Sequence, residues 1–372
     1  MTNVLRDHGS LEEVWEGFSI EGKFIGIKNF ELGHINETYI ALYDCNNQEK
    51  KYVHQKINHE VFRNIDGLMG NIRKVTNYIK DKLSRRQEFD LDRKVLSLVQ
   101  TKEGGDYLKD SSGKIWRSFN YIDNSKSFEV VRDSDIAYKV GKSFGEFQKL
   151  LSDFSTSELV ETILRFHDTP LRFNQLEEAI KRDEFGRAKY VEEEINFLMS
   201  RKREIDRLVD LTLLGKVPLR AVHYDTKCNN VLFDSVTENP LCVVDLDTVM
   251  PGLSLYDFGD MIRSGCNSAY EDEQDLFKVE IDSNFFNAMA EGYLDSTRSF
   301  LNKVEKNNLI FSVKLLGLEL GARFLTDHLR GDKYFRILRE EHNLDRARVQ
   351  LKFVESVEKK EKELERIVRG FV

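Results

Sequence analysis

The first third of the chain alternates short β-like runs with turn-prone residues. Such runs occur at residues 24–27, 38–43, 51–57, 106–108 and 114–122. Runs of this kind, separated by turn residues, predict the strands of an antiparallel meander. Between the third and fourth runs, apolar side chains recur at helical spacing over residues 66–83, which predicts an amphipathic helix. We therefore expect a small antiparallel sheet accompanied by one helix.

The hydrophobic period changes beyond residue 123. Apolar side chains repeat with a helical period at 136–151, 174–212, 271–303 and 305–330. Residues 351–369 are densely charged, which is typical of a solvated amphipathic helix. The pattern predicts an α+β fold of two lobes. Residues 1–122 form the small lobe with the antiparallel sheet, and residues 123–372 form a mainly helical lobe.

A polar motif interrupts the helical part of the chain. His223-Tyr-Asp225 is followed by Asn230, and a second apolar run, 241–244, ends at Asp245. Phosphoryl transfer needs a carboxylate to take the proton of the acceptor hydroxyl, and oxygen ligands to hold Mg²⁺ against nucleotide phosphates. The spacing matches the kinase catalytic loop, and it predicts Asp225 as the base and Asn230 and Asp245 as Mg²⁺ ligands with ATP as donor. The alternative is a turn stabilised by Asp225 and Asn230, with His223 in the core.

Segments around this motif resemble the aminoglycoside phosphotransferase and choline kinase superfamily: His223-Tyr-Asp-Thr-Lys-Cys-Asn-Asn-Val-Leu232, Val244-Asp-Leu-Asp-Thr-Val-Met-Pro-Gly252 and Tyr256-Asp-Phe-Gly-Asp260. Others are most similar to the N-acetylhexosamine 1-kinases within it: Gly33-His-Ile-Asn-Glu-Thr-Tyr39, Phe166-His-Asp-Thr-Pro170 and Arg323-Phe-Leu-Thr-Asp-His-Leu-Arg-Gly-Asp-Lys-Tyr334. The resemblance implies a two-lobed, protein-kinase-like fold. It also implies ATP- and Mg²⁺-dependent phosphorylation of the anomeric hydroxyl of N-acetylglucosamine or N-acetylgalactosamine.

The same resemblance implies which residues hold the sugar. It assigns contacts with sugar hydroxyl or acetamido groups to His34, Asn36, Arg323 and Tyr334, next to the base Asp225. Gly33 allows the backbone to approach a ligand closely, so its segment could instead cover the nucleotide phosphates or form a plain hairpin turn. Taken without the resemblance, Arg323 and Tyr334 are ordinary helix-surface residues.

The nucleotide is expected to contact the first lobe. Kinases carry a lysine on the third strand that pairs with the phosphates, and Lys56 is the nearest candidate. If Gln55 faces the phosphates instead, a neutral amide replaces that cation, because neighbouring residues of a strand point to opposite faces. Backbone at Tyr121 and Ile122 is expected to contact adenine.

Two further aspartates lie near the predicted metal ligand. Asp257-Phe-Gly259 matches the metal-binding motif of protein kinases, but it follows a loop and is placed to cap a helix, so we expect a structural role. Asp245 directly ends a strand and is the expected ligand. Asp247 is expected to act as a second ligand or to support the first.

Composition narrows the class of protein. The chain has 372 residues, 40% of them hydrophobic and 32% charged, which describes a globular protein. A net charge of −8 argues against a nucleic-acid partner, whose phosphates require a basic surface. The N-terminal residues lack a signal-peptide core and no long apolar run occurs, so we expect a cytoplasmic location without membrane contact. Four widely spaced cysteines are expected to be reduced thiols.

Two alternative functions remain at this stage. A relative in the same superfamily could phosphorylate another small alcohol, such as an aminoglycoside, choline or homoserine. A catalytically silent kinase fold could serve as a binding module, against which the intact Asp225, Asn230 and Asp245 argue. The sequence makes no prediction about oligomeric state or about the preferred sugar epimer.

Overall fold

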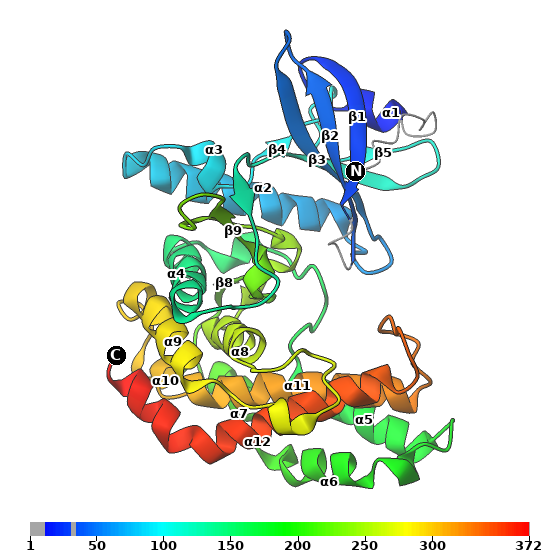
Figure 1. Ribbon diagram of the computed structural model, residues 1–372, viewed down its shortest axis with the longest axis vertical. Helices are drawn as coiled ribbons and strands as arrows, with labels where there is room; N and C mark the ends of the chain where they lie inside the picture. Colours follow the sequence, from blue (N-terminus) through cyan, green and yellow to red (C-terminus); the bar gives the residue numbers. More distant parts are fainter. Residues whose placement is uncertain (1–11, 31–34, 372) are drawn as a thin grey trace. The chain divides into compact units, whose positions relative to one another are not determined.

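The computed structural model describes residues 12–30 and 35–371. The chain divides into two compact units. The first, here called the sheet unit, comprises residues 1–126, 157–164 and 232–250. The second, here called the helical unit, comprises residues 127–156, 165–231 and 251–372. The predicted α+β fold class, with an antiparallel sheet and a mainly helical part, is confirmed (Figure 1). The functional assignment of residues 1–122 and 123–372 as lobes stays a prediction.

The sheet unit is built on an antiparallel sheet of six strands. Its order is β1-β2-β3-β6-β4, with β5 paired to β6. The strands are β1 Lys23–Phe30, β2 Glu37–Asp44, β3 Glu49–Ile57, β4 Leu98–Val99, β5 Leu108–Lys109 and β6 Ile115–Asn120. The helices are α1 Glu12–Gly17, α2 Ile65–Arg85 and α3 Leu91–Lys94. The predicted helix at 66–83 thus corresponds to α2, whose Asn64 side chain caps the first turn by accepting from the Gly67 amide.

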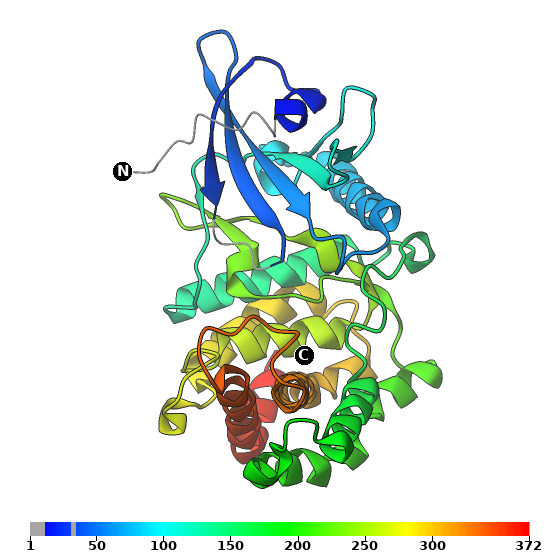
Figure 2. The ribbon, with the colours of Figure 1, turned by 90° about the vertical axis from the view of Figure 1, so that its right-hand side faces the viewer.

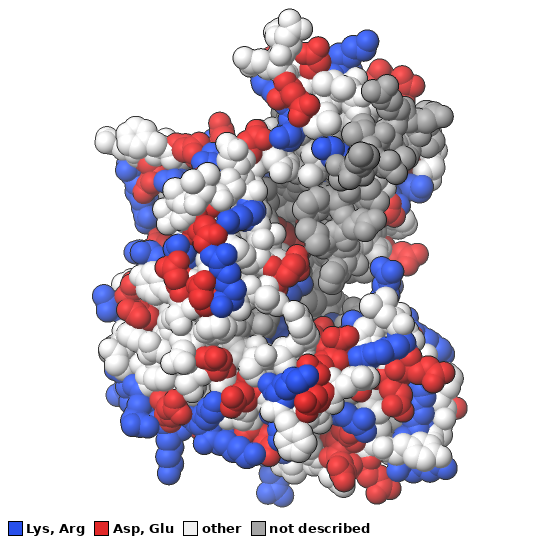
Figure 3. Space-filling view, in the orientation of Figure 1, with Lys and Arg blue, Asp and Glu red and all other residues white. Residues whose placement is uncertain are grey.

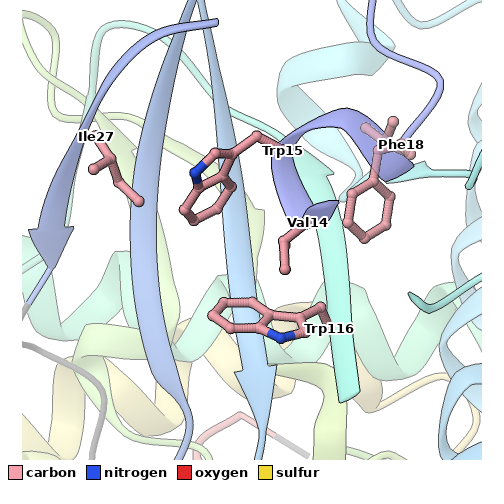
Figure 4. Packing of buried hydrophobic residues seen from close by; sticks show 6 residues of the cluster. Val14, Trp15, Phe18, Ile27 and Trp116 are labelled. Carbon is pink, nitrogen blue, oxygen red and sulfur yellow. The ribbon is translucent and has the colours of Figure 1, made fainter. Parts of the chain in front are cut away.

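One face of this sheet carries an aromatic core against α1. Trp15 and Trp116 pack edge to face with ring centroids 6.0 Å apart, next to Val14 (Figure 4). His54 is fully buried among these rings. Because side chains alternate along a strand, the residues next to Trp116 and His54 belong to the opposite face. That opposite face carries the polar side chains of Gln55 and Arg117, which are directly paired across β3 and β6.

A second, three-stranded sheet also belongs mainly to the sheet unit. Its order is β10-β9-β7, with β7 Ser125–Lys126, β9 Val231–Asp234 and β10 Pro240–Val243. The chain leaves β10 through the turn that contains Asp245 and Asp247. The apolar run predicted at 241–244 therefore does form a strand whose end presents these two aspartates.

The helical unit consists of long helices packed in pairs. Its elements are α4 Ser134–Leu150, α5 Thr169–Arg182, α6 Glu192–Ser200, α7 Arg207–Leu213, β8 Arg220–Val222, β11 Met250–Gly252, α8 Ser254–Gly265, α9 Ser283–Thr297, α10 Lys303–Lys306, α11 Leu309–Leu329 and α12 His342–Arg369. Helices α11 and α12 run side by side, and α4 packs along α9 (Figures 1 and 2). An added Cβ on Gly141 or Gly292 would collide with a backbone oxygen of the facing helix, so these glycines permit the close approach of α4 and α9.

Some predicted helices differ from the observed ones. The pattern at 174–212 is divided among α5, α6 and α7, because the chain turns through a left-handed Asp183 and a short irregular stretch. The pattern at 271–303 becomes helical only at Ser283, where Asp282 caps the helix. The charged segment at 351–369 belongs to the longer α12, which buries an apolar stripe that includes Phe353, Val357 and Leu364.

The surface agrees with a chain of mixed charge. On the face shown in Figure 3, acidic and basic side chains of the helical unit are interspersed. Within residues 12–30 and 35–371, no helix combines the length and the apolar character that crossing a bilayer requires.

Candidate active site

The predicted catalytic loop begins where β8 ends, in the helical unit. Tyr224 has φ of 68°, a left-handed conformation that is costly for a bulky side chain. The carboxylate of Asp257 stabilises this backbone by accepting from the amides of His223, at 2.9 Å, and Tyr224, at 2.8 Å. The amide of Thr226 donates to Asp260 at 3.0 Å. Two aspartates on α8 thus fix the backbone on both sides of Asp225.

Asp225 is half-buried and its carboxylate is oriented by two neighbours. The Asn230 side-chain amide donates to the Asp225 backbone carbonyl at 2.8 Å and to its Oδ2 at 3.2 Å. The ammonium of Lys227 lies 3.2 Å from the same Oδ2. Both neighbours therefore contact the same carboxylate oxygen, Oδ2. The structure brings Asp225 and Asn230 together as the motif predicts.

Asp257 is fully engaged by the protein around it. In addition to the two loop amides, it accepts a hydrogen bond from Gln148 at 2.7 Å. Burial raises the pKa of Asp257 above its ordinary value, against the opposing effect of His223 and the donated hydrogen bonds. Burial also opposes ionisation of Asp260, but the guanidinium of Arg263 holds the pKa of that carboxyl below its usual range. These contacts favour the structural role expected for Asp257.

The side chain of His167, two residues before α5, also contacts the loop. Nδ1 of His167 lies 2.7 Å from a carboxylate oxygen of Glu319, and Nε2 lies 3.3 Å from the carbonyl oxygen of Tyr224. The hydroxyl of Thr169 donates to the other Glu319 oxygen at 2.7 Å. Burial opposes ionisation of Glu319, but His167 holds the pKa of its carboxyl below the ordinary value. The rings of His167, Tyr224 and Tyr256 pack together beside this pair.

Arg323 and Tyr334, two of the residues assigned to the sugar by resemblance, share one aromatic neighbourhood. The Arg323 guanidinium lies 5.6 Å from the ring centroids of both Phe166 and Phe335. The ring of Tyr334 meets Phe335 edge-on at 4.8 Å and is largely exposed. The Tyr334 amide donates to Asp327 at 2.9 Å, which fixes the loop after α11. Arg323 and Tyr334 therefore flank the same ring.

In the sheet unit, the turn after β10 separates the two predicted metal-binding aspartates. Asp245 is exposed and has φ of 59°. Asp247 is buried: one carboxylate oxygen pairs with Arg117, and the other accepts from the Asn36 side chain at 2.6 Å. The Asn36 carbonyl oxygen accepts in turn from the Asn58 amide at 2.9 Å. Both ends of the Asn36 side-chain amide are thus engaged within the sheet unit, and its expected sugar contact stays a prediction.

Gln55 and Lys56 face opposite sides of β3. Gln55 accepts from two nitrogens of Arg117, at 2.9 and 2.8 Å, and donates to Thr38. Lys56 pairs with Glu37 on the other face. Gln55 therefore lies on the face of Asp247, where Arg117 supplies the cation. The contact of Lys56 or of Gln55 with the nucleotide phosphates stays a prediction.

Two of the remaining predicted positions, Tyr121 and Ile122, lie in the segment after β6. The Tyr121 amide donates to the Lys51 carbonyl at 3.3 Å, and the Ile122 carbonyl accepts from Ser125 at 2.6 Å. These two backbone groups are therefore occupied, and the contact of this segment with adenine stays a prediction. Gly33 and His34 lie outside the described residues.

The residues predicted for Mg²⁺ fit that ion chemically. Asp245 offers an exposed carboxylate, and Asn230 offers an amide oxygen while its nitrogen is held by Asp225. Mg²⁺ in nucleotide sites usually takes one or two such oxygen ligands and completes its shell with phosphates and water. Among the described residues, no three His, Cys, Asp or Glu side chains are grouped to hold a metal by themselves.

Several residues of this arrangement were not predicted to have a role. The only sequence signal at Arg117 was a charged residue among the mostly apolar residues of β6. Glu319 was marked in the same way within the apolar α11, and His167 lay in a quoted motif without an assigned contact. Their partners lie 130 or more positions away in the chain, so no local pattern could pair them.

Comparisons with known proteins identify a family and similar folds. Residues 106–297 match the family described as "Phosphotransferase enzyme family". Among solved structures, an aminoglycoside phosphotransferase from Alicyclobacillus acidocaldarius is 12% identical and has a TM-score of 0.59, with 92% of this chain and 95% of that chain covered. A microcompartment-associated aminopropanol kinase is 15% identical and has a TM-score of 0.56, with 95% and 97% covered.

A spectinomycin phosphotransferase, solved in complex with ADP and spectinomycin, is also similar. It is 15% identical with a TM-score of 0.54, and 94% of this chain and 96% of that chain are covered. At these identities the likeness establishes the fold. The family match spans just over half of the 372 residues and includes Asp225, Asn230 and Asp245, and the chain therefore belongs to the phosphotransferase enzyme family.

Proposed function

We propose that this phosphotransferase transfers the γ-phosphoryl group of ATP, with Mg²⁺, to the anomeric hydroxyl of an N-acetylhexosamine, giving the sugar 1-phosphate. The observation that supports phosphotransfer is the oriented carboxylate of Asp225, held by Asn230 and Lys227 in a loop whose strained backbone is stabilised by Asp257.

Asp225 is the general base of the proposed reaction. It accepts the proton of the acceptor hydroxyl as that oxygen forms a bond to the γ-phosphorus, and the bond from phosphorus to the β-phosphate oxygen breaks to release ADP. An anomeric hydroxyl is more acidic than an ordinary alcohol, so an aspartate suffices as its base. Lys227 supplies positive charge beside the carboxylate.

Asn230 and Asp245 are the proposed ligands of Mg²⁺. When bound, the ion neutralises the charge on the phosphate oxygens and fixes their orientation. Asn230 contributes its amide oxygen, since its nitrogen is engaged by Asp225. Asp245 contributes its exposed carboxylate.

The acceptor class rests on the sugar-binding motifs and on the aromatic neighbourhood of Arg323 and Tyr334. The guanidinium offers five donors for hydroxyl or acetamido oxygens while packed against Phe166 and Phe335. The exposed Tyr334 phenol can both donate and accept. These features support a neutral polyhydroxylated acceptor that carries an amide.

The test is turnover of ATP with a panel of acceptors. N-acetylglucosamine, N-acetylgalactosamine, choline, homoserine and an aminoglycoside are compared by ADP release and by identification of the phosphorylated product. We expect sugar 1-phosphate from one or both N-acetylhexosamines. Turnover confined to choline, homoserine or the aminoglycoside would overturn the acceptor, and no turnover with any of them would overturn the kinase assignment.

A single substitution tests the base. Asp225→Asn should lower kcat by about 10²–10⁴-fold, because it removes general-base catalysis, with KM for ATP and thermal stability nearly unchanged. The matched control is Asp210→Asn, which alters an exposed aspartate on α7 of the same unit. An Asp225→Asn enzyme that keeps more than about a tenth of the activity would refute this role.

A further inference from the structure

A buried ion pair lies behind the turn that carries Asp245. Arg117 on β6 is 1% exposed and Asp247 is 3% exposed, and the two are directly paired. Burying a guanidinium and a carboxylate has a large desolvation cost, which mutual attraction offsets only when the geometry is good and further hydrogen bonds are made. Pairs of this kind contribute little to stability compared with apolar residues, so their presence suggests a positional role.

Arg117 is held in one orientation by the neighbouring strand. Its Nε and one terminal nitrogen donate to Gln55 Oε1, at 2.9 and 2.8 Å, while the other terminal nitrogen faces Asp247. Gln55 is anchored in turn by its bond to Thr38 at 3.0 Å. The planar guanidinium, held by residues of β2 and β3, therefore fixes the position of Asp247 in the turn after β10.

Asp247 connects this network with two segments that have proposed roles. It lies two residues after Asp245, in the one-turn helix Leu246–Thr248, so fixing Asp247 restricts the direction in which the Asp245 carboxylate points. Its second oxygen accepts from Asn36, which directly precedes β2. The buried Asp247 carboxylate thus connects the turn that contains Asp245 with Asn36.

We propose that Arg117 and Asp247 are positioning residues for the Mg²⁺–nucleotide complex. They hold Asp245 in its left-handed turn and Asn36 against Asp247, and they do not touch the ion. The buried cation of this sheet face comes from β6, since Lys56 of β3 pairs with Glu37 on the opposite face. The inference rests on the proposed function in one respect, namely Asp245 as a metal ligand.

The test measures metal affinity without turnover. Mn²⁺ replaces Mg²⁺, ADP is the nucleotide, and water proton relaxation reports binding. Changes to residues that orient a ligand typically reduce metal affinity 10–100-fold, so Asp247→Asn and Arg117→Gln should each weaken Mn²⁺ binding by about 10–100-fold. The double variant should be no weaker than the worse single variant, because both changes remove the same interaction. Arg117→Lys keeps the charge but loses the fork, and should recover part of the affinity.

The control variant breaks a surface ion pair elsewhere in the sheet unit. Arg73 pairs with Asp106 at 2.6 Å at the surface, and Arg73→Gln should leave Mn²⁺ affinity unchanged. Melting curves ensure that each variant is measured while folded. Folded Arg117 variants with normal Mn²⁺ affinity would overturn the inference, as would Asp247→Asn losing affinity while Arg117→Gln does not, because Asp247 would then bind the ion directly.

Failure of the proposed function gives a different pattern. If no N-acetylhexosamine is phosphorylated but the Arg117, Asp245 and Asp247 variants weaken Mn²⁺ binding as expected, only the acceptor is overturned and the positioning role is supported. If Asp245→Asn leaves Mn²⁺ affinity unchanged, both the metal assignment and this inference are overturned.

Discussion

Replacing Asp257 by alanine should destabilise the catalytic loop rather than remove a metal ligand. The carboxylate of Asp257 accepts from the backbone amides of His223 and Tyr224 and from the Gln148 side chain, at 2.7 to 2.9 Å. All three donors lose their acceptor in Asp257→Ala. The two amides belong to buried residues, so water does not readily replace the missing oxygens.

The expected loss follows from these contacts. Leaving a buried donor unsatisfied costs about 1–3 kcal/mol, so the two backbone amides together account for about 2–6 kcal/mol. For a unit of the size of the helical unit, each kcal/mol of lost stability lowers Tm by about 2–4 °C. The melting temperature of Asp257→Ala should therefore fall by at least about 4 °C. Turnover should fall as well, because the strained backbone at Tyr224 that precedes Asp225 loses its support.

The assay compares Asp257→Ala with Asp245→Ala in two measurements. Thermal melting followed by circular dichroism reports stability, and Mn²⁺ titration with ADP below both melting temperatures reports metal affinity. We expect Asp257→Ala to lower Tm with little change in affinity, and Asp245→Ala to do the opposite because its carboxylate is exposed. An Asp257→Ala variant that melts like the wild type but no longer binds Mn²⁺ would refute the reasoning.

Two further predictions concern acid stability and substrate use. Burial lowers the pKa of His54 to about 3, so this histidine stays neutral in the folded protein while the unfolded chain takes up a proton below about pH 6.5. The contribution of neutral His54 to the free energy of unfolding is therefore fully present above pH 6.5 and falls by about 2 kcal/mol at pH 5. The His54→Leu variant should lose less stability than the wild type between pH 7 and 5. Equal losses in the two proteins would contradict this account. Arg323→Ala and Tyr334→Phe should lower kcat/KM for the N-acetylhexosamine by about one to two decades with KM for ATP unchanged, whereas normal sugar kinetics would exclude the proposed acceptor contacts.

The sequence by itself determined the features that depend on local pattern. The β-like runs at 38–43 and 51–57, bounded by turn-prone residues, sufficed for β2 and β3, and the helical period over 66–83 sufficed for α2. The contact between Asp225 and Asn230 was also predictable, since they are only five positions apart in one loop. The family was likewise predictable from linear motifs, because these motifs are short stretches of sequence.

Only the tertiary structure decided which residues meet across the chain. Alternation predicts that Gln55 and Lys56 face opposite sides of β3, but not which side each faces; the pairing of β3 with β6 decided it by placing Gln55 opposite Arg117. Asp247 meets Arg117 across 130 positions of sequence. Local periodicity records the direction of a side chain relative to its own strand or helix, whereas the partner of a buried charge is fixed by how distant elements pack, because that charge is stable only where the whole fold supplies its counter-charge.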